Sequence, residues 1–177
     1  MTTPTQRGWL SPLASLHARG VAWLERLQPA AQLLARFHVA SVFFRSGLTK
    51  IADWDTTLAL FADEYHVPLL DPTVAAWAGT AGELGLPVLL ALGLAGRFAA
   101  AGLSVVNVVA VTSLAEIADA ALQQHVFWGS LLVALLLWGP GRWSLDAQLW
   151  PRIRARMVGS LPGAAGRYTA PGADPRR

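Results

Sequence analysis

Six ionisable or polar side chains stand inside apolar stretches of this sequence, where an ionisable group costs about 2.5–3.5 kcal/mol to insert into a membrane. They are His38, Arg45, Lys50, Glu83, Asn107 and His125. An acid, two strong bases, an amide and two histidines can bind a small polar ligand or pass protons. The set predicts one polar pocket among the helices. The alternative is that these groups only hydrogen-bond helix to helix, at about 0.6 kcal/mol each.

The spacing in the first apolar stretch places several of these groups on one helical face. His38, Ser41, Arg45 and Thr49 follow one another at steps of three and four residues. At about 1.5 Å per residue, Arg45 lies about 10 Å from the end of its stretch and Glu83 about 15 Å from the matching end of the next. Because the two depths are similar, we predict an Arg45–Glu83 ion pair.

The elements that must position these residues are four stretches of membrane-spanning length. They cover Ala31–Ala52, Thr73–Ala95, Phe98–Ala118 and Gln123–Pro140. A spanning helix needs about 20 apolar residues, and helix is the structure that satisfies the backbone there. The chain is 54% hydrophobic and 14% charged, against about 25% charged for soluble domains. We therefore predict an all-α fold, an integral membrane four-helix bundle over residues 31–150.

The loop charges predict the orientation. The first loop contains acidic residues and no Lys or Arg, the second contains Arg97, and the third contains Glu116 and Asp119. By the positive-inside rule, both termini are cytoplasmic. Residues 1–30 are expected to form a cytoplasmic leader, either an amphipathic interfacial helix ended by Pro29 or a disordered segment. Residues 151–177 are expected to form a basic, disordered cytoplasmic tail.

Composition and loop residues narrow the chemistry. The chain has no cysteine, so a thiol nucleophile and Cys-ligated clusters are excluded. The basic residues near the spans are typical of contact with anionic lipid, and we predict no nucleic-acid partner. In the first loop, Leu58, Phe61 and Tyr65 fit a short amphipathic helix. Asp63, Glu64 and His66 in the same loop are more typical of a solvated acidic face than of a metal site, so no metal is predicted.

Residues 31–150 resemble the DoxX family of bacterial membrane proteins. The resemblance lies in the first span, from Arg36 through Gly47 to Lys50, and in Glu83 followed by an apolar run and Arg97. Its most specific part is the ending Gly139-Pro-Gly-Arg-Trp-Ser-Leu-Asp146, where Asp146 is expected to cap a helix or to pair with Arg142. The resemblance implies a multi-pass protein of the bacterial inner membrane, but it transfers no catalytic residues.

Two functions follow from the resemblance. Some members are subunits of thiosulfate:quinone oxidoreductases, and others belong to oxidative-stress assemblies or to metal-homeostasis operons. The preferred interpretation is an accessory or docking component of a redox-stress or metal-homeostasis pathway that is not an enzyme on its own. It would act with a protein partner or as a homo-oligomer. The alternative is a quinone-reactive oxidoreductase subunit, with Arg45 or His125 bonding a quinone carbonyl and Glu83 relaying a proton.

Overall fold

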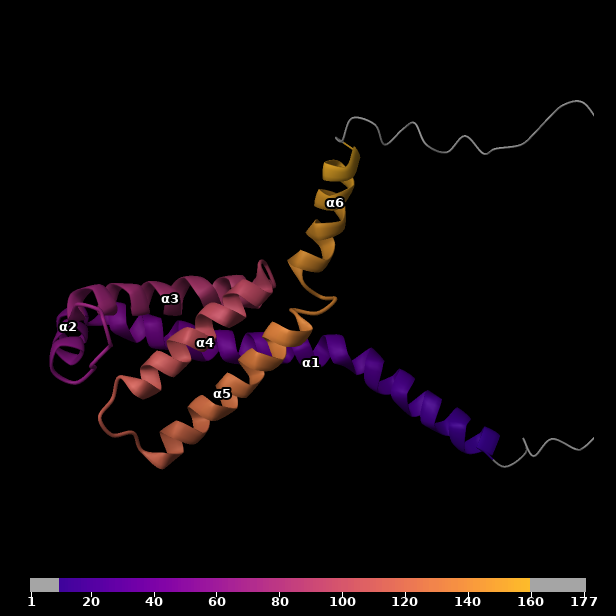
Figure 1. The fold of residues 1–177 in the computed structure, drawn as a ribbon, viewed down its shortest axis with the longest axis horizontal. Coiled ribbons are helices and arrows are strands. Elements are labelled where there is room, and N and C mark those ends of the chain that lie inside the picture. Colours follow the sequence, from indigo (N-terminus) through magenta and orange to yellow (C-terminus); the bar gives the residue numbers. More distant parts are fainter. Residues whose placement is uncertain (1–9, 160–177) are drawn as a thin grey trace, which may run out of the picture.

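The computed structural model describes residues 10–159, with side chains from Leu13 to Arg154, and this part of the chain consists of helices joined by turns and loops, without a strand (Figure 1). The helices are α1 (Leu10–Ala52), α2 (Trp54–Asp63), α3 (Pro72–Leu92), α4 (Gly96–Thr112), α5 (Asp119–Trp138) and α6 (Leu145–Gly159). The predicted all-α class is confirmed. The four long apolar helices begin and end within a few residues of the predicted stretches, except that α4 ends six residues earlier and α1 begins earlier.

The helices pack pairwise around a main apolar core, and α2 and α3 form a second, smaller apolar cluster. α1 contacts α3 and α5, α4 contacts the same two helices, and α2 lies against α3 and α1. The core side chains are Val39, Phe43, Leu90, Ala99, Ala100, Leu103, Leu132 and Leu135. A side chain at Gly47 would meet Leu84 at 2.8 Å and the backbone of Glu83 at 3.2 Å. The missing side chain at Gly47 therefore lets α1 and α3 approach closely, as small residues do between membrane helices.

Two predicted boundaries outside the core are wrong. α1 is a continuous helix of 43 residues that runs through the buried Pro29, so the predicted helix end at Pro29 is wrong. One missing hydrogen bond does not terminate a helix that is supported on both sides by further turns. α6 extends to Gly159, so residues 151–159 of the expected disordered tail are helical. Residues 160–177 and 1–9 lie outside the described residues.

The outer surface of the helices is apolar. Large exposed side chains include Leu34 and Phe37 on α1, Phe98 on α4, and Phe127 and Leu137 on α5. Within the described residues, α3 and α5 are each long and apolar enough to cross a membrane, and α4 is an apolar helix of 17 residues. Apolar side chains that face outward along such helices are typical of contact with lipid.

The connection between α1 and α3 is held by two aspartate caps. The Asp53 carboxylate accepts hydrogen bonds from the backbone N–H of Thr56 at 3.0 Å and from its hydroxyl at 2.7 Å. These bonds hold the pKa of Asp53 below its ordinary value. Asp71 caps α3 by accepting from the N–H of Thr73 at 2.9 Å, with Pro72 at the first helical position. The predicted loop helix is confirmed as α2, which buries Phe61.

Candidate functional site

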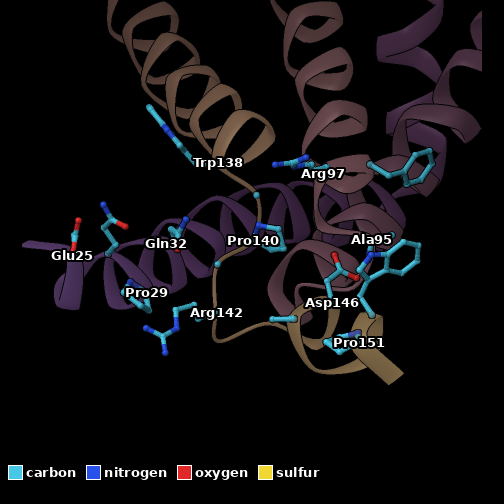
Figure 2. Close-up of a pocket in the computed structure, with 16 residues that line it drawn as sticks. Glu25, Pro29, Gln32, Ala95, Arg97, Trp138, Pro140, Arg142, Asp146 and Pro151 are labelled. Carbon is cyan, nitrogen blue, oxygen red and sulfur yellow. The ribbon is translucent and has the colours of Figure 1, made fainter. Parts of the chain in front are cut away.

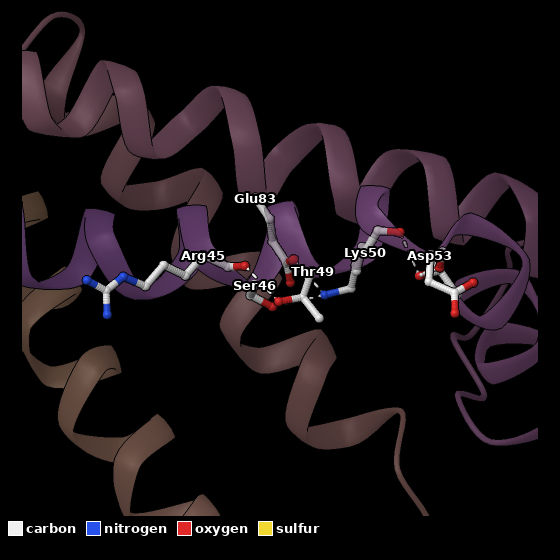
Figure 3. Close-up of polar contacts among 7 residues, drawn as sticks. Arg45, Ser46, Thr49, Lys50, Asp53 and Glu83 are labelled. Carbon is white, nitrogen blue, oxygen red and sulfur yellow. Dashed lines mark hydrogen bonds and ion pairs between the residues drawn. The ribbon is translucent and has the colours of Figure 1, made fainter.

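An ion pair joins α1 to α3 near the end of the molecule that carries α2, here called the α2 end. The Lys50 ammonium lies 2.5 Å from Oε2 of Glu83 and 3.0 Å from the hydroxyl of Ser46 (Figure 3). The Glu83 side chain is 8% exposed and the Lys50 side chain 20% exposed. A buried carboxylate among apolar helices needs such a partner, because an unpaired charge is very costly there.

The predicted Arg45–Glu83 ion pair is wrong. The Arg45 side chain is exposed and extends away from Glu83, while its carbonyl accepts a hydrogen bond from Thr49 (Figure 3). Similar depth along the two helices favoured Arg45, although Lys50 lies only five residues further along α1. Rotation around the helix axis decided between them: Lys50 follows Arg45 by five residues, which at 3.6 residues per turn points the two side chains in different directions.

Asn107 on α4 and His125 on α5 form a second polar contact between helices. The Asn107 amide nitrogen donates to the carbonyl of His125 at 3.0 Å, and its amide oxygen lies 2.8 Å from Nδ1 of His125. Since that oxygen can only accept, Nδ1 carries the proton and Nε2 of the neutral imidazole is an acceptor. Asn107 thus fixes both the tautomer and the orientation of the ring.

A cavity of about 450 Å³ brings the two polar contacts together. Its polar lining includes Ser46, Lys50, Glu83 and His125, and its apolar lining comes from all five helices α1 to α5 and the loop before α3. The apolar lining includes Phe43, Phe61, Val67, Val105, Val106, Val109, Leu114 and Trp128. A volume of this size, mostly apolar with a few convergent polar groups, is typical of a small-molecule site.

Tyr65, Trp128 and Ser46 are cavity residues that the sequence analysis missed as a site. The Tyr65 ring packs tilted against Phe61 with ring centroids 5.0 Å apart, and Trp128 meets His125 edge-on at 5.0 Å. Burial and the carboxylates of Glu64 and Glu83 raise the pKa of Tyr65 above its ordinary value, so its hydroxyl remains a donor. The helical spacing from Lys50 and His125 could have indicated Ser46 and Trp128, whereas only the folded loop brings Tyr65 to the cavity.

His38 does not belong to the cavity. Its ring is exposed and packs edge-on against Phe127 of α5, with centroids 5.7 Å apart. Of the six predicted residues, Lys50, Glu83 and His125 line the cavity and Asn107 supports it from behind. His38 and Arg45 lie outside it.

Asp146, at the opposite end of the molecule, caps α4. Its carboxylate accepts from the backbone N–H groups of Ala95 and Gly96, both at 2.8 Å, while its own N–H donates to Gly93 at 2.9 Å. A negative charge at a helix N-terminus is favourable, because the first N–H groups of the helix have no carbonyl partner within it. Asp146 is therefore a helix cap, one of the two roles expected of it, and it does not pair with Arg142.

Arg36, on α1, binds the loop before α6 at the same end of the molecule. Its side chain is 1% exposed and donates from Nη2 to the carbonyl of Trp143 at 2.6 Å. The guanidinium fits beside Gly93, which has a φ of +64° and no side chain to occupy that space. Together Arg36 and Asp146 tie the loop before α6 to the turn between α3 and α4. This explains physically why the ending from Gly139 to Asp146 combines glycine, proline and aspartate.

The fold is all-helical over the described residues, and its apolar helices are typical of a membrane protein. Residues 31–116 match the family model DoxX, and this part of the chain is a DoxX domain. The match extends from the apolar half of α1 to the loop after α4, so it includes Lys50, Glu83 and Asn107 but not His125. Comparison with curated proteins gives no match, and comparison with solved structures gives none either.

Proposed function

We propose that this protein is an accessory component of a bacterial redox-stress or metal-homeostasis pathway, and that it holds a small amphipathic molecule of the quinone class in the cavity at the α2 end. The observation that carries the proposal is the cavity itself: about 450 Å³, mostly aromatic and aliphatic, with the Lys50–Glu83 pair and His125 on its wall. An aromatic ring matches the apolar lining, and oxygen atoms on that ring match the polar groups.

The hydrogen-bonding capacity left at the cavity fits a ring with an oxygen acceptor at one end and a hydroxyl donor at the other. The Lys50 ammonium has three N–H donors, and its contacts with Glu83 and Ser46 use two of them. The third can donate to a carbonyl oxygen. Nε2 of His125 can accept from a hydroxyl, because Asn107 holds the proton on Nδ1. A carbonyl or hydroxyl oxygen at the Lys50 end and a hydroxyl at the His125 end would therefore find partners.

An accessory role is preferred because the chain has no cysteine and so no thiol of its own for redox chemistry. A protein that holds a quinone in the membrane requires a partner enzyme to supply or accept electrons. We therefore propose a protein partner, or a second copy of the chain, at the apolar outer surface.

A second candidate is a quinone-reactive subunit of a thiosulfate:quinone-type oxidoreductase. It is favoured by the position of Glu83, a buried carboxylate on the cavity wall and within 2.5 Å of an ammonium group. In this role Glu83 would exchange protons with the bound ring, as buried acids do in membrane proton relays. Arg45 lies outside the cavity, so Lys50 is the cation that can bond a quinone carbonyl there.

Binding of a short-chain benzoquinone to the purified protein tests the proposal. Isothermal titration should show one saturable site, with affinity reduced about 10- to 100-fold in Lys50→Met, since a hydrogen bond from a charged group contributes about 1.5–3 kcal/mol. Arg45→Gln removes a cation outside the cavity and should leave affinity unchanged. No saturable binding, or an equal loss in both variants, would refute the proposal.

The effect of the substitution Glu83→Gln distinguishes the two candidate functions. In membranes that also contain the partner enzyme, Glu83→Gln should abolish quinone-dependent turnover if Glu83 relays protons. If the chain is an accessory component, the turnover rate should depend only on how much quinone is bound. Glu83→Gln should then lower the turnover rate and the bound quinone by the same factor.

We also propose four membrane spans, in residues 31–52 of α1 and in α3, α4 and α5, with both termini in the cytoplasm of a bacterial cell. The acidic residues at the α2 end and the basic residues at the end that carries α6 support this orientation. Because the chain contains no cysteine, single-cysteine variants can be labelled in intact spheroplasts with an impermeant maleimide. Asp63→Cys should react, and Arg19→Cys should react only after lysis; the reverse pattern would overturn the orientation.

A further inference from the structure

A second, larger cavity lies at the end of the molecule that carries α6, here called the α6 end. It has a volume of about 1010 Å³ and is lined by residues 25–32 of α1, the start of α4, the end of α5 and the start of α6 (Figure 2). An apolar groove of about 470 Å³ between α1 and α5 adjoins it. The two share Gln28, Gln32 and Trp138, so they form one continuous depression.

The larger cavity carries charges of both signs. Arg97 uses Nη2 to donate to the carbonyl of Leu137 at 3.2 Å, which leaves its other N–H groups available. Arg142 and Glu25 also line the cavity, are exposed, and form no hydrogen bond or ion pair with any residue that the structure describes. The fourth charge, on Asp146, is already used as the cap of α4. Two cations and one anion are therefore free.

The adjoining groove has the dimensions and lining of an acyl-chain site. Apart from the shared residues it is lined by Ala31, Ala35, Leu131, Ala134 and Leu135. The alanines on both helices leave a narrow apolar channel that faces the lipid. Trp138 stands where the groove meets the charged cavity and is 72% exposed, which is the usual position of tryptophan at the boundary between headgroups and hydrocarbon.

We infer that the charged cavity and the apolar groove together bind one phospholipid with a primary ammonium headgroup, of the phosphatidylethanolamine type. Arg97 and Arg142 bind the phosphate, Glu25 binds the ammonium, and one acyl chain lies in the groove between α1 and α5. Guanidinium groups suit phosphate because they donate several hydrogen bonds in a planar array. A lipid whose headgroup carries only the anionic phosphate would offer the Glu25 carboxylate no cationic partner. A quaternary ammonium headgroup would offer Glu25 no N–H donor.

Native mass spectrometry of the full chain in detergent micelles tests this site. The protein is mixed with equal amounts of phosphatidylethanolamine, phosphatidylglycerol and phosphatidylcholine that have identical acyl chains. The ethanolamine lipid should be retained at least 10-fold over the other two. Arg97→Gln with Arg142→Gln should remove that retention. The matched double variant Arg19→Gln with Arg152→Gln has the same net charge but changes residues outside the cavity, and should bind like the unaltered protein.

Two further measurements separate this site from general attraction to lipid. Glu25→Gln changes one exposed side chain, so it should fold normally and should shift the preference toward phosphatidylglycerol. Glycerophosphoethanolamine, which has the headgroup without acyl chains, should compete at least 100-fold more weakly than the lipid. Equal loss in the two double variants, a preference for phosphatidylglycerol in the unaltered protein, or equal competition by the chain-free headgroup would each overturn the inference.

Discussion

Neutralising Glu83 should strongly destabilise the protein, because it leaves the Lys50 ammonium without a counter-ion. In Glu83→Gln the Lys50 ammonium loses its counter-ion and keeps only the hydroxyl of Ser46, 3.0 Å away. Removal of one partner from a buried ion pair costs about 3–5 kcal/mol. Because the Lys50 side chain is 20% exposed and keeps one hydrogen bond, we expect a loss near the lower limit, about 3 kcal/mol.

Thermal unfolding in detergent, followed by tryptophan fluorescence, measures this loss. For a chain of this size, 1 kcal/mol shifts Tm by about 2–4 °C, so Glu83→Gln should unfold about 6–12 °C lower. The double variant Glu83→Gln with Lys50→Met removes both charges and should recover most of the stability, since apolar replacement of a whole pair is often neutral. Arg45→Gln is the matched control and should stay within about 0.5 kcal/mol.

The reasoning would be refuted by one pattern of results. If Arg45→Gln destabilises the protein as much as Glu83→Gln does, and the effects of the Glu83 and Lys50 variants simply add, then the two side chains do not interact. The charge partner of Glu83 would then be Arg45, as spacing along the sequence alone suggested.

Three further predictions concern the ends of the helices. Gly93→Ala should lower the free energy of unfolding by at least about 2 kcal/mol, because a Cβ there overlaps the Arg36 guanidinium and the positive φ is strained for alanine. Gly85 has open space around it, so the control Gly85→Ala should be neutral or stabilising. Asp146→Asn should cost about 1–2 kcal/mol in the same assay, because two backbone N–H groups lose a charged acceptor. The cap that Asp53 provides should be complete above its unfolded pKa of about 3.9 and be lost as pH falls through its lowered folded pKa. Hydrogen-exchange protection of α2 should therefore fall at low pH in the native protein but not in Asp53→Asn.

The sequence by itself determined the helices and the polar set, because both depend on local properties. Apolar length predicts where a helix can lie in a membrane, and α3 and α5 begin and end within a few residues of the predicted stretches. The cost of burying charge singled out Lys50, Glu83, Asn107 and His125 as residues that needed partners. Local signals that a longer context overrides were misleading, as at Pro29, where the helix continues through the proline.

The partners themselves depended on the tertiary structure. Whether Glu83 meets Arg45 or Lys50 is decided by the rotation of α1 against α3, which close packing at Gly47 sets and which no periodicity records. Tyr65 reaches the cavity because a loop folds over it, and Asp146 reaches the start of α4 across 50 residues of chain. Spacing along a helix shows which side chains share a face, but the orientation of that face toward its neighbours is a property of the packed molecule.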